Sequence, residues 1–152
     1  MKKYFIPLFL LLISFSSIAQ KKKEIVTADV ITINSKILKE MRTAWVYNPG
    51  NKNESKTYPV IYVLDGESHF RSVVAMVGYL SDANVIPPMI VVGILHLNRM
   101  KDLTPTIEDT IGDSRGENSG GGENFISFIK NELFPDIESK YSTAPYRVLM
   151  GH

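Results

Sequence analysis

The stretch Tyr58–Gly66, YPVIYVLDG, decides the fold. Its central segment, Val60–Leu64, is apolar at nearly every position. A continuous apolar run is typical of a strand that is covered on both faces, as in a parallel sheet flanked by helices. Asp65 and Gly66 are residues that favour a turn. We therefore predict a buried strand over Val60–Leu64 with a turn directly after it.

Strand and helix patterns alternate on both sides of this strand. Two earlier segments, Glu24–Ile33 and Arg42–Gly50, have the β-branched alternation of strands, and the second closes with Asn-Pro-Gly. The polar stretch Asn51–Thr57 is predicted to be a hairpin-type loop. Ser68–Leu80 has apolar residues at helical spacing, and Met89–Ile94 is a second fully apolar strand.

The C-terminal part continues the alternation. Asn98–Gly122 is polar and rich in glycine, which predicts a long loop, and Glu123–Tyr141 has the spacing of a helix. Pro135 should kink that helix or split it in two. Tyr146–Gly151 is the fifth predicted strand. Two antiparallel-type strands followed by strand–helix–strand–helix–strand indicate an α/β fold with helices on both faces of a mainly parallel sheet.

Composition bounds the function classes. The chain of 152 residues is long enough for one domain, and its 44% hydrophobic and 22% charged residues are typical of a globular protein. The 17 Lys plus Arg against 16 Asp plus Glu give a net charge of +1, which argues against nucleic-acid binding. There is no cysteine, so neither a disulfide nor a lipid-modified N-terminal cysteine is possible.

Cofactor and metal motifs are absent from the sequence. No G-x-G-x-x-G follows the first strand, and the loop Gly112–Gly122 lacks the lysine and serine of a phosphate-binding loop. The acidic residues near this loop do not have the spacing of a calcium-binding loop. We therefore expect no cofactor and no metal; the acidic residues considered are Asp109, Asp113, Glu117 and Glu123.

The first residues differ in kind from the rest of the chain. In MKKYFIPLFLLLISFSSIAQ, Lys2 and Lys3 precede the apolar run Ile6–Ile13, and Ser17 and Ala19 are small. This pattern indicates a secretory signal peptide with cleavage after Ala19. The run is shorter than the roughly 20 apolar residues that span a bilayer. We expect a secreted or periplasmic protein, with a signal peptide over residues 1–19, a domain over residues 20–152 and no stable membrane insertion.

Two short motifs carry the candidate chemistry. Gly151 and His152 follow the last strand, where the nucleophile elbow G-x-S-x-G of an α/β-hydrolase would begin, so the nucleophile would directly follow His152. Gly66 and Glu67 follow the central strand, where such enzymes place a backbone oxyanion donor worth about 2.7–4 kcal/mol. Taken singly, the motifs can also be explained as an ordinary turn and a glycine loop.

Four segments in register resemble one known family. They are YPVIYVLDGESHF (58–70), NRMKDLTPT (98–106), GGGENFISFIKNELFPDIESKY (120–141) and YRVLMGH (146–152). Together they resemble the secreted putative-esterase family of α/β-hydrolases, which includes esterase D-like enzymes, siderophore esterases, feruloyl esterases and mycolyltransferases. The resemblance runs from Arg42 to His152 and implies a GHSxGG-type elbow that begins at Gly151.

The resemblance implies roles for individual residues. Glu67 would supply a backbone N–H to the oxyanion hole, and Gly66 would let the backbone approach the substrate. His152 would lie beside the nucleophile and would not be the catalytic base. Substrate-binding candidates are Arg99, Asp102, His69 and His96. Alternatively, Arg99 and Asp102 form a salt bridge that shapes their loop, and His69 caps a turn.

The implied function is that of an exported serine esterase. The triad Ser, Asp or Glu, and His would lie beyond residue 152, so these 152 residues alone are expected to be inactive. The substrate would be a small-molecule ester, such as a siderophore, a feruloyl or acetyl ester on polysaccharide, or a thioester. The alternatives are an acyltransferase of the same family and a non-catalytic exported binding module or remnant on the same scaffold. The oligomeric state is left open.

Overall fold

The computed structural model describes residues 28–50, 55–105 and 119–151. These residues form one five-stranded sheet with the strand order β1-β2-β4-β3-β5. The strands are β1 (Asp29–Ser35), β2 (Glu40–Tyr47), β3 (Tyr58–Val63), β4 (Ile90–Ile94) and β5 (Thr143–Met150).

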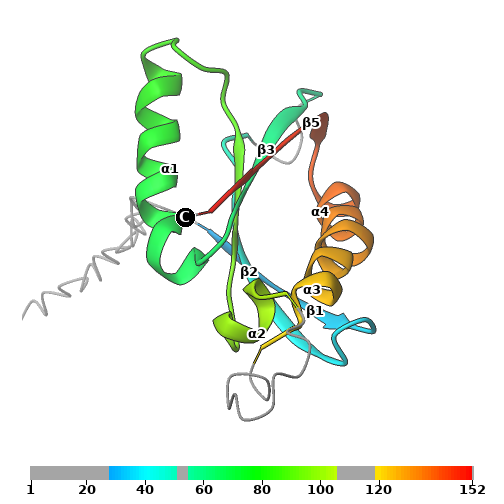
Figure 1. The fold of residues 1–152 in the computed structure, drawn as a ribbon. Helices are drawn as coiled ribbons and strands as arrows, with labels where there is room; N and C mark the ends of the chain where they lie inside the picture. The colour runs from blue at the N-terminus through cyan, green and yellow to red at the C-terminus, as the bar shows by residue number, and fades with distance from the viewer. Residues whose placement is uncertain (1–27, 51–54, 106–118, 152) are drawn as a thin grey trace, which may run out of the picture.

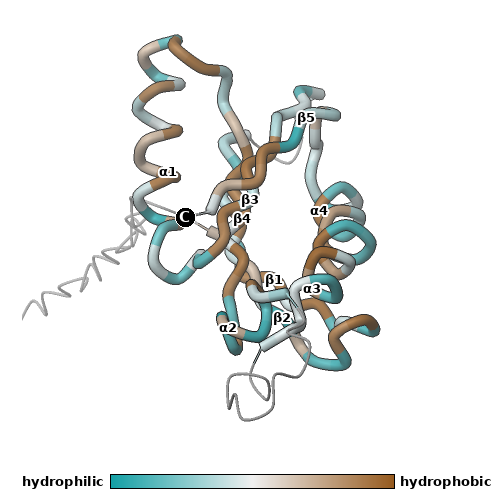
Figure 2. Tube along the Cα trace, in the orientation of Figure 1, coloured by the Kyte–Doolittle hydropathy of each residue, from teal (hydrophilic) through white to brown (hydrophobic). Residues whose placement is uncertain are grey.

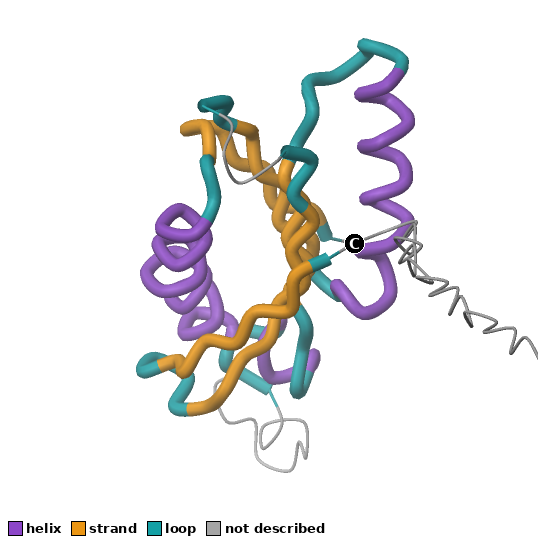
Figure 3. The backbone as a smooth tube through the Cα atoms, turned by 180° about the vertical axis from the view of Figure 1, so that it is seen from behind, coloured by secondary structure: helices purple, strands orange, loops and turns teal. Residues whose placement is uncertain are grey.

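The direction of the strands confirms the predicted α/β fold. β1 pairs with β2, and β2 with β4, in antiparallel fashion, whereas β3 runs parallel to both of its neighbours, β4 and β5. The long helix α1 (Gly66–Asp82) covers one face of the sheet, and α3 (Gly122–Phe128) and α4 (Phe134–Lys140) cover the other (Figures 1 and 3). Strands β3 and β4 are therefore enclosed on both sides, as their continuous apolar sequences predict.

The prediction of a loop over Asn98–Gly122 is wrong at its start, where the structure has a short helix, α2 (Arg99–Leu103). The Asn98 side chain caps it by accepting a hydrogen bond from the N–H of Lys101 at 3.1 Å. Asparagine is among the best N-cap residues. The polar composition of the segment favoured the prediction of a loop, although Asn98 is a typical N-cap residue and could have indicated the start of a helix.

The predicted split of the helix at Pro135 is not seen: the helical run continues from Gly122 to Lys140, and what changes before the proline is its hydrogen-bond pattern. Before the proline the helix widens into a π-helical segment, η2 (Ile129–Leu133), and α4 begins at Phe134. The N–H of Phe134 reaches back five positions to the carbonyl of Ile129. A proline inside a helix has no N–H and crowds the carbonyl four residues before it. The wider turn fits the proline while the chain direction is kept.

Two apolar cores lie on opposite faces of the sheet. Strands β3 and β4 are the most hydrophobic part of the trace and separate the cores (Figure 2). The core under α1 includes Phe70, whose ring meets Trp45 edge to face with a centroid distance of 5.7 Å. The core under α3 and α4 includes Phe125, Phe128, Ile129, Leu133 and Ile137.

Several sequence predictions lie outside the described residues. They are the signal peptide over 1–19, the start of the first predicted strand at Glu24, most of the loop that begins at Asn51, residues 106–118 of the predicted polar loop and the position of His152. Of the helices that the structure does describe, none has the length and apolar character needed to cross a membrane.

Candidate active site

The candidate site lies where the parallel strands end. The backbone N–H of Leu64, after β3, donates to the carbonyl oxygen of Met150, the last residue of β5, at 2.8 Å. Gly151 continues from Met150 and lies against the Leu64 side chain. The loop Asp65–Glu67 and the candidate elbow are therefore neighbours. Ligands of open α/β sheets bind at this carboxyl edge.

Asp65 starts α1 with an unusual backbone. It is buried, and its φ of 51° and ψ of 47° lie in the left-handed region. Its carbonyl accepts hydrogen bonds from the N–H groups of Ser68 (2.9 Å) and His69 (3.1 Å). The N–H groups of Gly66 and Glu67 precede these, and the first N–H groups of a helix have no acceptor within it. Both are placed to donate to an anion at the helix N-terminus.

Gly66 has a packing reason to be glycine. A Cβ at Gly66 would lie 2.7 Å from the carbonyl carbon of Gly93 in β4. A Cβ at Gly93 would in turn lie 2.8 Å from the Phe70 ring. The two glycines therefore let α1 sit directly on β4. This contact accounts for Gly66 without the approach to substrate that the resemblance implies.

A buried ionic network surrounds this loop. Arg99 binds the Asp65 carboxylate through two nitrogens, with Nε–Oδ1 at 2.7 Å and Nη2–Oδ2 at 3.2 Å. His96, just after β4, donates from Nδ1 to Oδ2 of Asp102 at 2.9 Å. Its Nε2 lies 3.8 Å from Oδ1 of Asp65 and has no hydrogen-bond partner among the described residues. The imidazole thus lies between two carboxylates.

Arg42 completes the network from β2. Its Nη2 donates to Oδ2 of Asp102 at 2.5 Å and its Nη1 to Oε1 of Glu40 at 2.8 Å. Its guanidinium also lies over the rings of Phe125 and Phe128, at 5.3 and 5.8 Å from their centroids. The Arg42 side chain is only 2% exposed. A buried guanidinium of this kind needs such partners to offset its lost hydration.

The pKa of Asp102 reflects these contacts. Burial alone would raise the pKa of this carboxyl, but hydrogen bonds from His96 and Arg42 outweigh burial and hold the pKa below its ordinary value. Asp102 therefore remains a carboxylate in the folded protein at neutral pH.

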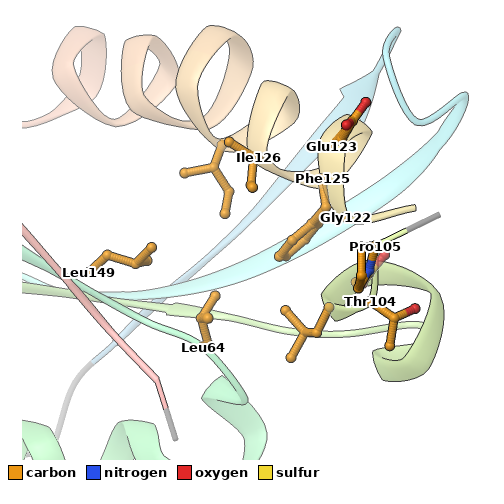
Figure 4. A pocket seen from close by; sticks show the side chains of 11 residues that line it. Leu64, Thr104, Pro105, Gly122, Glu123, Phe125, Ile126 and Leu149 are labelled. Carbon is orange, nitrogen blue, oxygen red and sulfur yellow. The ribbon is translucent and has the colours of Figure 1, made fainter. Parts of the chain in front are cut away.

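An apolar pocket of about 370 Å³ adjoins the loop. Leu64 and Leu149 from the sheet form one side, Phe125 and Ile126 of α3 form another, and the end of α2 with Pro105 closes a third (Figure 4). It opens beside the residues that lead into Gly66 and Gly151. It could hold an apolar group whose polar end lies at the N-terminus of α1.

The structure separates the predicted site residues into two groups. Arg99, Asp102 and His96 come together in the network, but the His96 and Asp102 side chains are buried and Arg99 pairs with Asp65 in place of Asp102. The proposed Arg99–Asp102 salt bridge is therefore wrong. His69 lies half-buried in the first turn of α1, where its backbone N–H bonds Asp65.

The remaining predicted residues lie at the edge of the site. Glu67 is exposed on the first turn of α1, and Gly151 is exposed at the end of β5. The sequence analysis did not identify two members of the ionic network, Arg42 and Asp65. Asp65 was visible as the first residue of the turn, but an arginine in an edge-proximal strand gives no sequence signal. Within residues 28–50, 55–105 and 119–151, no group of three or more His, Asp or Glu side chains could hold a metal ion.

The sequence and the fold of this chain are similar to those of known proteins. A model of the family described as "Putative esterase" matches residues 35–152. The crystal structure of an IroE-like serine hydrolase from Shewanella oneidensis is similar at 35% identity and a TM-score of 0.75, over 83% of this chain and 42% of that protein. The BES protein from Bacillus cereus is similar at 26% identity and a TM-score of 0.71, over 87% of this chain and 56% of that protein.

A curated relative is also similar. The uncharacterized protein YbbA of Bacillus subtilis is 27% identical over 94 residues, which are 62% of this chain and 38% of YbbA. The chain thus spans less than half of the length of YbbA and of the Shewanella hydrolase.

Proposed function

We propose, because the chain belongs to the Esterase family, that it forms the N-terminal part of a serine esterase that hydrolyses small-molecule carboxylic esters. A serine directly after His152 would attack the ester carbonyl, with a histidine as base and a carboxylate that orients it. The resulting acyl-enzyme would then be hydrolysed by water. Without those later residues, residues 1–152 would not turn over an ester.

One observation carries this proposal. The hydrogen bond from Leu64 to Met150 brings the start of α1 beside the end of β5. In this proposal the N–H groups of Gly66 and Glu67 would serve a nucleophile that follows His152, and the closeness of Leu64 to Met150 supports it. Donors fixed in place before the reaction stabilise the oxyanion of the tetrahedral intermediate without reorganisation.

The apolar pocket supports an assignment for the acyl group. Its walls are mainly aliphatic and aromatic, with Leu64 and Leu149 at the end nearest the loop. An apolar acyl or aroyl group bound there would leave its carbonyl at the N-terminus of α1. Siderophore, feruloyl and acetyl esters, and small thioesters, are the substrate panel to test.

The test of the proposed function is hydrolysis by the complete reading frame. The expected result is turnover of p-nitrophenyl acetate and labelling by a fluorophosphonate probe at the residue after His152. Residues 1–152 alone should show neither. An Ala substitution of that serine is the matched control. The proposal fails if the complete protein hydrolyses no ester of the panel, or if residues 1–152 alone cleave p-nitrophenyl acetate faster than a Gly66→Pro control.

Export is a separate part of the proposal. It is supported by the charged start at Lys2 and Lys3, the short apolar run and the small residues up to Ala19. Mass spectrometry of the natural protein should find a mature N-terminus at Gln20 in the periplasmic or secreted fraction. An intact Met1 in the cytosolic fraction would contradict it.

A further inference from the structure

We propose that the chain of contacts Arg42–Asp102–His96–Asp65–Arg99, which is buried except at Arg99, positions the N–H groups of Gly66 and Glu67. Asp65 and His96 are, in this inference, positioning residues for the oxyanion loop. The inference rests on the proposed esterase function, because the loop has a catalytic role only in such an enzyme.

The network fixes the loop through the backbone conformation of Asp65. Residues other than glycine seldom adopt a positive φ, and they keep it where surrounding contacts impose it. The Asp65 side chain makes no capping bond to the first turn of α1, although aspartate is a preferred N-cap residue. Its carboxylate is directed to Arg99 and His96 instead. The side chain therefore fixes the loop from outside the helix.

The network reaches the loop from three different elements. Arg42 belongs to β2, Arg99 and Asp102 to α2, and His96 to the segment that follows β4. Each of the two carboxylates, Asp65 and Asp102, has a guanidinium on one side and the imidazole of His96 on the other. Removal of one member leaves a neighbouring buried charge without its partner, which favours movement of the loop.

The burial of the His96 and Asp102 side chains distinguishes a positioning role from substrate binding. The His96 side chain is 2% exposed and the Asp102 side chain 5%. His96 does not line the pocket, so an effect of His96 on catalysis must pass through Asp65 and the loop, whereas Asp102 is one of the residues that line the pocket. Arg99 is 46% exposed and closes the network on the solvent side.

The test uses the complete reading frame and the variants Asp65→Asn, His96→Gln and Arg99→Gln. Asparagine keeps the size of Asp65 and tolerates the left-handed region, so Asp65→Asn removes mainly the charge. We expect kcat for p-nitrophenyl acetate to fall about tenfold to a hundredfold, as small displacements of catalytic groups do. KM should stay within about twofold, because an oxyanion donor acts in the transition state.

A second readout is independent of activity. Amide hydrogen exchange over residues 64–70 should accelerate in the three variants, while exchange over residues 73–82 of the same helix stays at the wild-type rate. Asp136→Asn, in an exposed pair with Lys140 on α4, is the matched control and should change neither readout. Arg99→Gln lies at the exposed end of the network and keeps the test usable if a buried variant unfolds.

The outcomes separate the two proposals. If Asp65→Asn and His96→Gln retain the wild-type kcat and wild-type exchange, the network does not position the loop. A larger change in KM than in kcat would assign the residues to substrate binding and would also overturn the inference. If the wild-type protein hydrolyses no ester, the esterase proposal fails by itself. Exchange over residues 64–70 then decides whether the network holds the loop.

Discussion

The N–H of Leu64 donates to the carbonyl oxygen of Met150 at 2.8 Å, and this bond joins the ends of β3 and β5. Gly151 follows β5 directly, and Gly66 follows β3 after Leu64 and Asp65. Parallel pairing in register thus brings together two motifs that are far apart in the sequence. A small displacement of either strand would separate the proposed oxyanion loop from the candidate elbow, so residues that fix β3, β4 and α1 affect the candidate site.

Gly66→Ala should destabilise the protein by about 1–3 kcal/mol, the usual range for overpacking. Its Cβ would lie 2.7 Å from the backbone of Gly93, which belongs to the sheet and cannot rotate away. The urea midpoint, measured by circular dichroism with the m-value held in common, checks this.

Gly78→Ala in the same helix is the matched control. A Cβ at Gly78 meets nothing within 4 Å. Alanine should therefore stabilise this helix by about 0.5–1 kcal/mol, because glycine loses more conformational freedom on folding. An equal effect of the two variants would show that contact with β4 does not account for Gly66.

Glu132→Ala should destabilise the protein by about 1–3 kcal/mol, the penalty for leaving polar groups unpaired. The Glu132 carboxylate accepts hydrogen bonds from Ser35 Oγ at 2.5 Å and from the N–H groups of Lys36 and Ile37 at 2.9 and 3.2 Å. It thereby ties η2 to the turn between β1 and β2. Calorimetric melting checks the loss, and Asp136→Ala in the exposed pair on α4 should change stability by less than about 1 kcal/mol. Equal losses of stability in the two variants would contradict a stabilising role of the Glu132 hydrogen bonds.

The fold was predictable because its signals are local and repeated. The continuous apolar runs at Val60–Leu64 and Met89–Ile94 mark strands covered on both sides, and they became β3 and β4. Pro135 predicts a disturbance of the last helix for a covalent reason, its missing N–H. The sequence did not predict that the helical run continues through a π-helical segment over Ile129–Leu133.

The site was predictable only in part. Asp65, Gly66 and Glu67 stood out because a turn after a buried strand is a common place for function. The pairing of Arg99 with Asp65, and of Arg42 with Asp102, depends on how β2 and α2 approach the strand ends. Such partners are determined by tertiary geometry. The sequence names His96 and Asp102 as substrate-binding candidates, but it does not predict that both side chains are buried or that Asp102, and not His96, lines the pocket.

Acidification should weaken the wild-type protein more than Asp102→Asn. Contacts with His96 and Arg42 hold the pKa of Asp102 below its ordinary 3.8 in the folded state, whereas the unfolded chain has the ordinary value. The folded state therefore binds fewer protons, and this stabilisation is present above pH 3.8 and lost as the pH falls toward the folded pKa. Urea midpoints at neutral pH and at a pH below 3.8 check the difference. Identical pH dependence in the two proteins would contradict the coupling.

Arg42→Met should cost about 3–5 kcal/mol of stability, the range for breaking a buried pair on one side. Methionine fills much of the apolar space of the arginine, but it leaves the Asp102 carboxylate, which is 5% exposed, without its guanidinium. The double variant Arg42→Met with Asp102→Leu removes both charges, so it should be more stable than the single variant, because no buried charge then lacks its guanidinium. Lys140→Met, in an exposed pair, should change stability by less than about 1 kcal/mol. Urea unfolding of the wild type, Arg42→Met, Asp102→Leu and the double variant gives the coupling energy. A double variant no more stable than Arg42→Met would show that Arg42 stabilises chiefly through its contacts with Phe125 and Phe128.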